Sequence, residues 1–77
     1  MSDFPAPDLE QAIHIITNHL ETHELCIQKK IDRQSLEKLI SIEIESYGGV
    51  KQFGSYSGWL YFAFKDIVEN TKNTLRK

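Results

Sequence analysis

Apolar residues recur at the spacing of an α-helix in three separate stretches of this chain. A helix with one apolar stripe buries that stripe against another element. Three such helices joined by short connections predict an all-α fold, a small three-helix bundle with helices over about 8–23, 33–47 and 57–73. The stripes are Leu9, Ala12, Ile13, Ile16 and Leu20; Leu36, Leu39, Ile40, Ile44 and Tyr47; and Trp59, Leu60, Ala63, Phe64, Ile67 and Val68.

Local signals mark several ends of these helices. Asp8 stands where the first helix begins, and Asp32 is a good N-cap for the second. Gly48 supplies the left-handed residue that ends many helices. Two prolines make residues 1–7 an extended lead-in, and we expect residues 74–77 to fray.

Two connections have more than one reading. Residues 25–30 fit either a continuation of the first helix or a short extended connector, and we expect the connector. Residues 50–53 are compatible with a short strand, but a single strand has nothing to pair with, so we expect a turn or loop.

The length of 77 residues predicts one domain, residues 1–77. Cys26 is the only cysteine, so we interpret it as a core thiol in a reducing compartment. The N-terminus has no secretory pattern, and the longest apolar run, 59–64, is too short to cross a bilayer. These features predict a cytoplasmic protein.

Charge is distributed unevenly along the chain. Residues 1–28 carry five acidic and no basic side chains, whereas residues 29–77 carry nine basic and six acidic ones. This asymmetry predicts either pairing between the two halves or an acidic face for a basic partner. The acidic candidates for partner binding are Glu10, Glu21 and Glu24.

The residues that could support catalysis or metal binding are few. His19 and His23 share a helix face and Cys26 follows, but no second cluster supplies a fourth ligand. All three histidines lie on the first predicted helix, away from every candidate nucleophile. The glycines match no phosphate-binding motif. We therefore predict a protein that is not an enzyme and has no metal or cofactor.

Nucleic-acid binding is the alternative hypothesis, as a small transcription-associated or DNA-binding regulator. The order Tyr47-Gly48-Gly49 and then Ala63-Phe64-Lys65-Asp66 is similar in spacing to the middle of the Mor-type transcription activators of transposable phages. That family places a helix, Gly-Gly, a short strand and another helix in this order. Its aromatic-Ile-Pro strand and its C-terminal helix-turn-helix are missing here, so no functional residue is carried over. The acidic net charge of −2 also disfavours direct DNA contact.

Seven of the eight aromatic residues, together with all four glycines, fall between positions 47 and 64. A core of this size holds only some of these rings. We expect Trp59 and Phe64 to lie in the core and Tyr47 and Phe53 to cover it, which leaves Tyr56, Tyr61 and Phe62 as the candidates for exposure. Positions 59–64 cover every side of a helix, so some of their apolar surface must face away from the core.

These observations predict a non-enzymatic protein-binding module, a small regulator or inhibitor of the antitoxin, immunity-protein or phage-inhibitor kind. Its partner would be another protein, with a basic or nucleic-acid-binding protein as one candidate, or a second copy of the chain. The acidic first helix would steer a basic partner. The predicted aromatic anchors are Tyr56, Trp59, Tyr61 and Phe62.

Overall fold

The chain folds into the all-α bundle that its apolar stripes predict. The structure is a computed structural model that describes residues 4–77, so residues 1–3 of the predicted lead-in lie outside it. The first half of the chain forms α1 (Leu9–Leu20), the short helix α2 (Glu24–Lys29) and α3 (Arg33–Tyr47). The bounds of α3 agree with the prediction, whereas α1 ends three residues earlier than expected.

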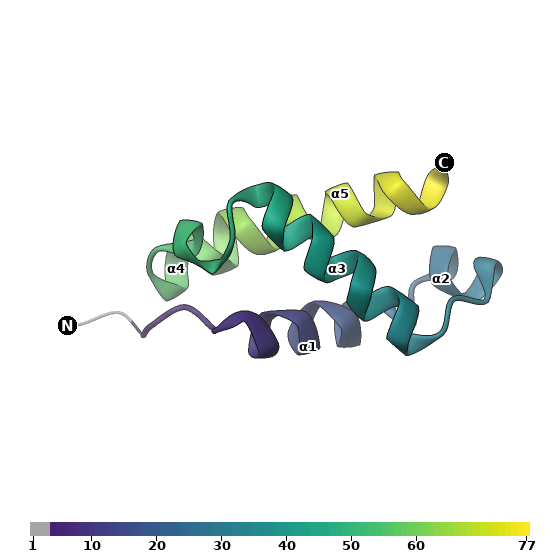
Figure 1. Cartoon of the computed structure of the whole chain (residues 1–77), viewed down its shortest axis with the longest axis horizontal. Coiled ribbons are helices and arrows are strands. Elements are labelled where there is room, and N and C mark those ends of the chain that lie inside the picture. The colour runs from purple at the N-terminus through teal and green to yellow at the C-terminus, as the bar shows by residue number, and fades with distance from the viewer. Residues whose placement is uncertain (1–3) are drawn as a thin grey trace.

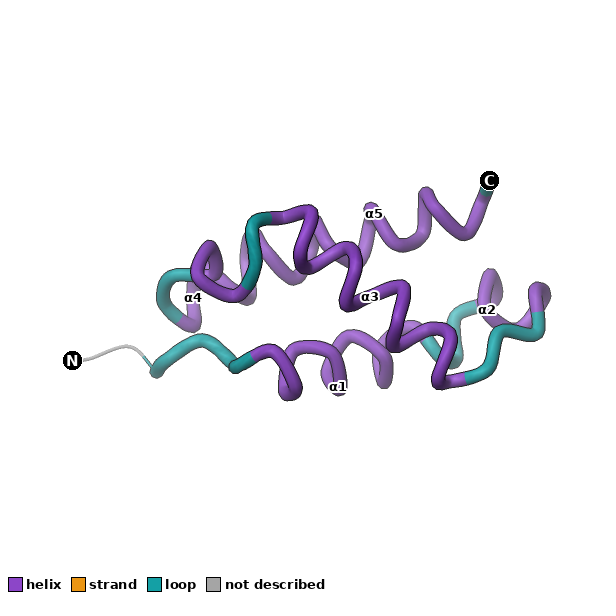
Figure 2. The backbone as a smooth tube through the Cα atoms, in the orientation of Figure 1, coloured by secondary structure: helices purple, strands orange, loops and turns teal. Residues whose placement is uncertain are grey.

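One long helix forms the C-terminal part of the molecule. A 3₁₀ turn, η1 (Val50–Phe53), leads into this helix, which comprises α4 (Tyr56–Gly58), the π-helical segment η2 (Trp59–Ala63) and α5 (Phe64–Arg76). Figure 1 shows α1 and α5 pointing in the same direction, with α3 running back between them and α2 beside the C-terminal end. Short loops join these helices (Figure 2).

Two details of the prediction are wrong, the extended connector at 25–30 and the frayed tail from residue 74, whereas the turn expected at 50–53 is confirmed. Residues 24–29 form a helix rather than an extended connector, because His23 acts as its N-cap and accepts a hydrogen bond from the Leu25 N–H. Residues 50–53 form a 3₁₀ turn, and no strand forms within residues 4–77. The predicted fraying from residue 74 does not occur before Arg76, because Leu75 is buried against the bundle.

The caps explain why α1 and α3 begin where they do. The Asp8 side chain accepts from the Gln11 N–H, and the Gln11 side chain accepts from the Asp8 N–H, which forms a capping box. Asp32 accepts from the Ser35 N–H at 2.8 Å. Gly48 ends α3 in the left-handed conformation, with φ of 117°.

The C-terminal helix contains one wide turn. The Phe64 N–H donates to the carbonyl of Trp59, five residues earlier, which makes η2 π-helical. On a straight α-helix, residues spaced four apart are each rotated by about 40° from the one before, so a series of them winds around the helix. One extra residue in a wide turn compensates for about 100° of this rotation. The wide turn therefore keeps the buried side chains on one side of the helix. Those spaced four apart are Trp59, Ala63, Ile67, Thr71 and Leu75.

Aromatic packing closes the end of the core next to η2. The Trp59 ring lies 4.7 Å from the Phe53 ring and 5.5 Å from the Phe64 ring, measured between centroids. Trp59 and Phe53 are buried, and Phe64 is half-buried and in a T-shaped contact with the His19 ring. Within residues 4–77, none of the helices combines the length and the apolar content needed to cross a bilayer.

Candidate protein-binding surface

Large apolar side chains are exposed on α4, on η2 and on the N-terminal segment that contacts Tyr56. We call this set the aromatic surface. The exposed fractions are 76% for Phe4, 39% for Tyr56, 37% for Leu60, 59% for Tyr61 and 67% for Phe62. Single exposed apolar residues are ordinary on a protein surface, but neighbouring ones of this size mark contact sites. The exposure expected for Tyr56, Tyr61 and Phe62 is confirmed.

The π-helical turn is what presents three of these residues together. Leu60, Tyr61 and Phe62 are consecutive and exposed, while Trp59 before them and Ala63 after them are buried. A five-residue turn has more residues on its outer side than an α-helical turn has. Trp59 and Ala63 on both sides of this turn are buried in the core, which anchors the backbone that carries the three outer side chains.

The N-terminal segment contributes the remaining exposed ring. The Tyr56 N–H donates to the Phe4 carbonyl at 2.9 Å, and Pro5 forms an isolated antiparallel bridge with Ser55. The Phe4 and Tyr56 rings meet edge to face, with centroids 6.5 Å apart. The sequence patterns did not identify Phe4 as a site residue, because this contact joins positions about fifty residues apart and has no local signal.

Trp59 is a correction to the predicted anchors. Its side chain is only 1% exposed, so it fills the core and is not available to a partner. The prediction assigned it both roles, because a helix that is apolar on all sides does not reveal which side faces inward. Of the residues expected to cover the core, Phe53 is buried and Tyr47 is half-buried.

The aromatic surface carries no charge of its own. No Asp, Glu, Lys or Arg occurs between Lys51 and Lys65. The polar groups of its side chains are the hydroxyls of Tyr56 and Tyr61, which both donate and accept hydrogen bonds. The surface is therefore suited to an apolar or aromatic partner.

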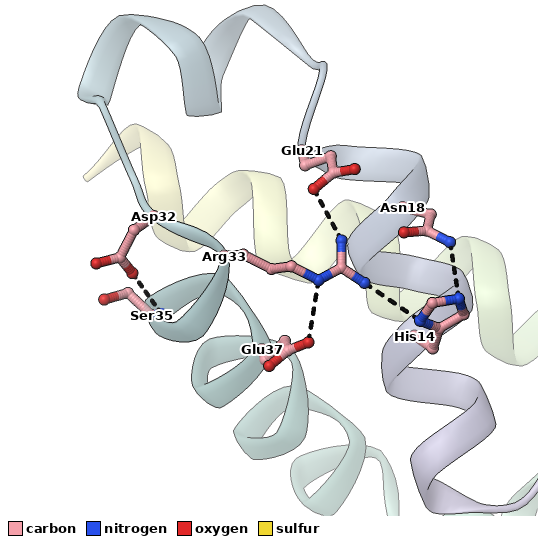
Figure 3. Close-up of polar contacts among 7 residues, drawn as sticks. All are labelled: His14, Asn18, Glu21, Asp32, Arg33, Ser35 and Glu37. Atoms are coloured by element: carbon pink, nitrogen blue, oxygen red, sulfur yellow. Dashed lines mark hydrogen bonds and ion pairs between the residues drawn. The ribbon is translucent and has the colours of Figure 1, made fainter.

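The three predicted acidic residues do not form one patch. Glu10 lies in the first turn of α1, and Glu21 is the C-cap of this helix, about 16 Å further along its axis. Glu24 is the first residue of α2. Glu21 also pairs with Arg33 at 2.8 Å, and Arg33 lies 3.3 Å from Glu37 (Figure 3). Part of the charge asymmetry is therefore neutralised within the chain.

His14 belongs to the same polar cluster. Nη2 of Arg33 lies 3.2 Å from His14 Nδ1, and the Asn18 amide group lies 3.1 Å from His14 Nε2 (Figure 3). A guanidinium group can only donate, so His14 Nδ1 accepts in its contact with Arg33. The cluster links α1 to α3 and is a structural contact at the surface.

His19, His23 and Cys26 do not converge on a common point. His23 Nδ1 caps α2, and the His19 ring packs on Phe64 at 5.2 Å. Cys26 is buried, and this burial raises the pKa of its thiol. Among the residues that the structure describes, no group of three His, Cys, Asp or Glu side chains could hold a metal ion.

A groove of about 1050 Å³ follows α1 and α3 and ends at the aromatic surface. Its lining mixes charged and apolar groups, and Tyr56 belongs both to the groove and to the aromatic surface. This mixture gives the groove no distinct chemical preference. Six of the lining residues are Pro5, Glu10, Ile13, Glu37, Lys38 and Tyr56.

No protein-family model, curated protein or solved structure matches this chain. The similarity in spacing to the Mor-type activators is therefore not supported by a family match. The segment after Gly48-Gly49, where that family has a strand, is a 3₁₀ turn in this chain.

Proposed function

We propose that this protein is a non-enzymatic binding module, a small regulator or inhibitor that acts through protein–protein contact at the aromatic surface. The observation that supports this most directly is the exposure of Leu60, Tyr61 and Phe62 side by side on one π-helical turn. π-Helical turns are rare and occur often at functional sites.

The composition of this surface agrees with known interface energetics. Tyrosine and other aromatic residues are enriched at protein interfaces, where a few buried rings supply most of the binding free energy. Trp59 and Phe53 pack against each other beneath η2, so the backbone of this turn is already held in place before a partner binds.

Charge gives the partner a second expected property. Glu10 and Glu24 are exposed and belong to no ion pair that the structure records, so they can attract a basic protein from a distance. Glu21 contributes less, since Arg33 already neutralises it. A cytoplasmic location is part of this proposal, because a single buried, unpaired cysteine is typical of reducing compartments.

Affinity capture from the native cell, followed by mass spectrometry, tests the proposal. The bait variants are the wild type, a Tyr61→Ser/Phe62→Ser double variant, and an Ile27→Ser/Ile42→Ser control. The control pair is similarly exposed, at 63% and 57%, but lies outside the aromatic surface. Circular dichroism should show that all three proteins are folded.

We expect a specific protein to be captured by the wild type and by the control, and to be lost from the Tyr61→Ser/Phe62→Ser bait. Capture of the same proteins at equal yield by all three baits would contradict the proposal, because the exposed rings would then contribute nothing to binding.

A further inference from the structure

We propose that the protein forms a two-fold symmetric dimer, in which the aromatic surface of one copy packs against the same surface of a second copy. This inference rests on the proposed function, because it specifies what contacts the surface. It assigns the aromatic surface to another copy of this chain in place of the basic protein partner described above, and three properties of the surface favour that choice.

The first property is its lack of charge. In a two-fold contact a surface patch faces the same patch of the other copy, so a charge near the centre of the contact meets an identical charge. The segment 52–64 contains no ionisable acid or base apart from tyrosine. A surface shaped for a differently charged partner would instead carry complementary charges, which would repel a second copy.

The second property is self-complementary hydrogen bonding. Carboxylates only accept and ammonium groups only donate, so neither pairs with its own kind at neutral pH. The hydroxyls of Tyr56 and Tyr61 both donate and accept, and each can therefore pair with the same group of another copy. Aromatic rings likewise pack well on other aromatic rings, in edge-to-face or offset arrangements.

The third property is size. With about 200 Å² for each large side chain, the exposed fractions of the five residues correspond to about 550 Å² per chain. Burying all of this area in both copies would remove about 1,100 Å² from water, and this is an upper limit because Leu60 and Phe62 point to different sides of the helix. Interfaces of this size are weak and transient, so the area fits a weak, reversible dimer.

The other exposed apolar residues do not form an equivalent surface: they are Leu9 and Ile15, six residues apart on α1, Ile27 on α2 and Ile42 on α3. Ile42 on α3 lies one helical turn from Lys38 and from Glu45, and Ile27 on α2 lies one turn from Glu24 and from Lys30. Each is a single apolar side chain among charges. Ile42 is therefore a suitable control position.

Sedimentation velocity on charge-substituted variants tests the dimer. Phe62→Glu and Phe62→Lys place a charge in the aromatic surface, and Ile42→Glu places one outside it. We expect the wild type and Ile42→Glu to sediment as dimers at about 100 µM. Each Phe62 variant should be monomeric there, with association weakened at least about tenfold. Circular dichroism spectra like that of the wild type would show that the variants are folded.

The two Phe62 variants should associate when mixed in equal amounts, because a Glu on one aromatic surface and a Lys on the other attract rather than repel. A wild-type protein that stays monomeric would overturn the dimer and leave the proposed function to the capture experiment. A dimer that persists in both Phe62 variants, or a mixture that stays monomeric, would overturn the pairing of this surface with itself. Capture that is insensitive to Tyr61 and Phe62 would instead contradict the proposed function.

Discussion

Trp59 and Phe62 lie three positions apart on the same helix, yet they occupy opposite environments. Trp59 is 1% exposed between Phe53 and Phe64, whereas Phe62 is 67% exposed. Hydrophobicity alone does not separate them. The position of each side chain relative to α3 and to the wide turn determines whether it stabilises the fold or is available for contact.

Replacing Trp59 should therefore destabilise the whole domain. We expect Trp59→Ala to lower the free energy of unfolding by about 3–5 kcal/mol, because it leaves a cavity beside two rings. That loss is comparable to the total stability of a small domain, about 5 kcal/mol. Urea unfolding followed by circular dichroism measures it. Phe62→Ala is the matched control and should change the stability by less than about 0.5 kcal/mol. Equal losses in both variants would contradict these assignments.

Asp32 makes the stability of the folded protein depend on pH. Hydrogen bonds from the backbone and side chain of Ser35, together with nearby Lys38, hold the pKa of Asp32 below its ordinary value. A carboxylate whose pKa is lower in the folded state stabilises the fold above its unfolded pKa, near 4, and loses this effect as the pH falls through the folded value.

Asp32→Asn keeps a capping oxygen but removes this titration. We expect the wild type to have the higher unfolding midpoint at pH 7, and the difference to shrink as the pH falls below about 4. Thermal unfolding of the two proteins between pH 7 and pH 2.5 measures it. A difference that stays constant with pH would show that the carboxylate charge has no part in capping α3.

At the scale of elements, η2 can be tested by changing its length. Deleting Tyr61 removes the extra residue of the π-helical turn, so the remaining turn can become α-helical. Trp59 and Ala63 would then be three apart and still share one helix face. We expect the variant to unfold cooperatively within about 1 kcal/mol of the wild type, and to lose both the capture and the dimer proposed for the aromatic surface.

Deletion of Glu69 from the regular part of α5 is the control. It rotates the buried residues on one side of the deletion by about 100° relative to those on the other. Circular dichroism should show loss of the cooperative fold in this variant alone. If both deletions unfold the protein, the wide turn is required for packing rather than for presenting side chains.

Gly58 tests how closely η1 packs on the C-terminal helix. A Cβ atom there would lie 2.7 Å from the carbonyl oxygen of Phe53, although the backbone of Gly58 is helical. Alanine normally stabilises a helix by about 1 kcal/mol relative to glycine. The steric conflict should outweigh that gain, and Gly58→Ala should lower the unfolding free energy by about 1–2 kcal/mol. Asn70→Ala, at an exposed position in α5, should be neutral or stabilising; a stabilised Gly58→Ala would show that η1 moves freely.

The elements also show which structural signals are local. The bounds of α3 were predictable because Asp32 and Gly48 lie at its ends and cap it. The start of α2 was not, because it depends on His23 as an N-cap, a residue type with little preference for that position. The π-helical turn leaves a trace in the four-residue spacing of buried positions from Trp59 to Leu75. The spacing indicates a wide turn only once Trp59 and Leu75 are both known to be buried, because a straight α-helix would turn one of them away from the core.

For the whole molecule, composition predicted that aromatic residues would be exposed, but it did not predict every residue that belongs to the aromatic surface. The exposure of Tyr56, Tyr61 and Phe62 followed from the excess of rings over core volume. The contribution of Phe4 depends on the N-terminal segment folding back onto Ser55 and Tyr56, a long-range contact. The predicted acidic face is divided, because pairing of Glu21 with Arg33 depends on how α1 and α3 pack.

The last prediction concerns the stability of the assembled molecule. If two copies pair through the aromatic surface, association stabilises the folded state, and the melting temperature depends on protein concentration. For a domain of this size, each tenfold increase in a concentration range where the dimer dominates should raise the melting temperature by about 3–5 °C. Differential scanning calorimetry between 20 and about 500 µM measures this shift. Phe62→Glu should show a melting temperature independent of concentration, because a charge on the aromatic surface removes the association and leaves the monomer's core intact. A wild-type melting temperature that does not change with concentration would mean that the folded chain gains no stability from a second copy.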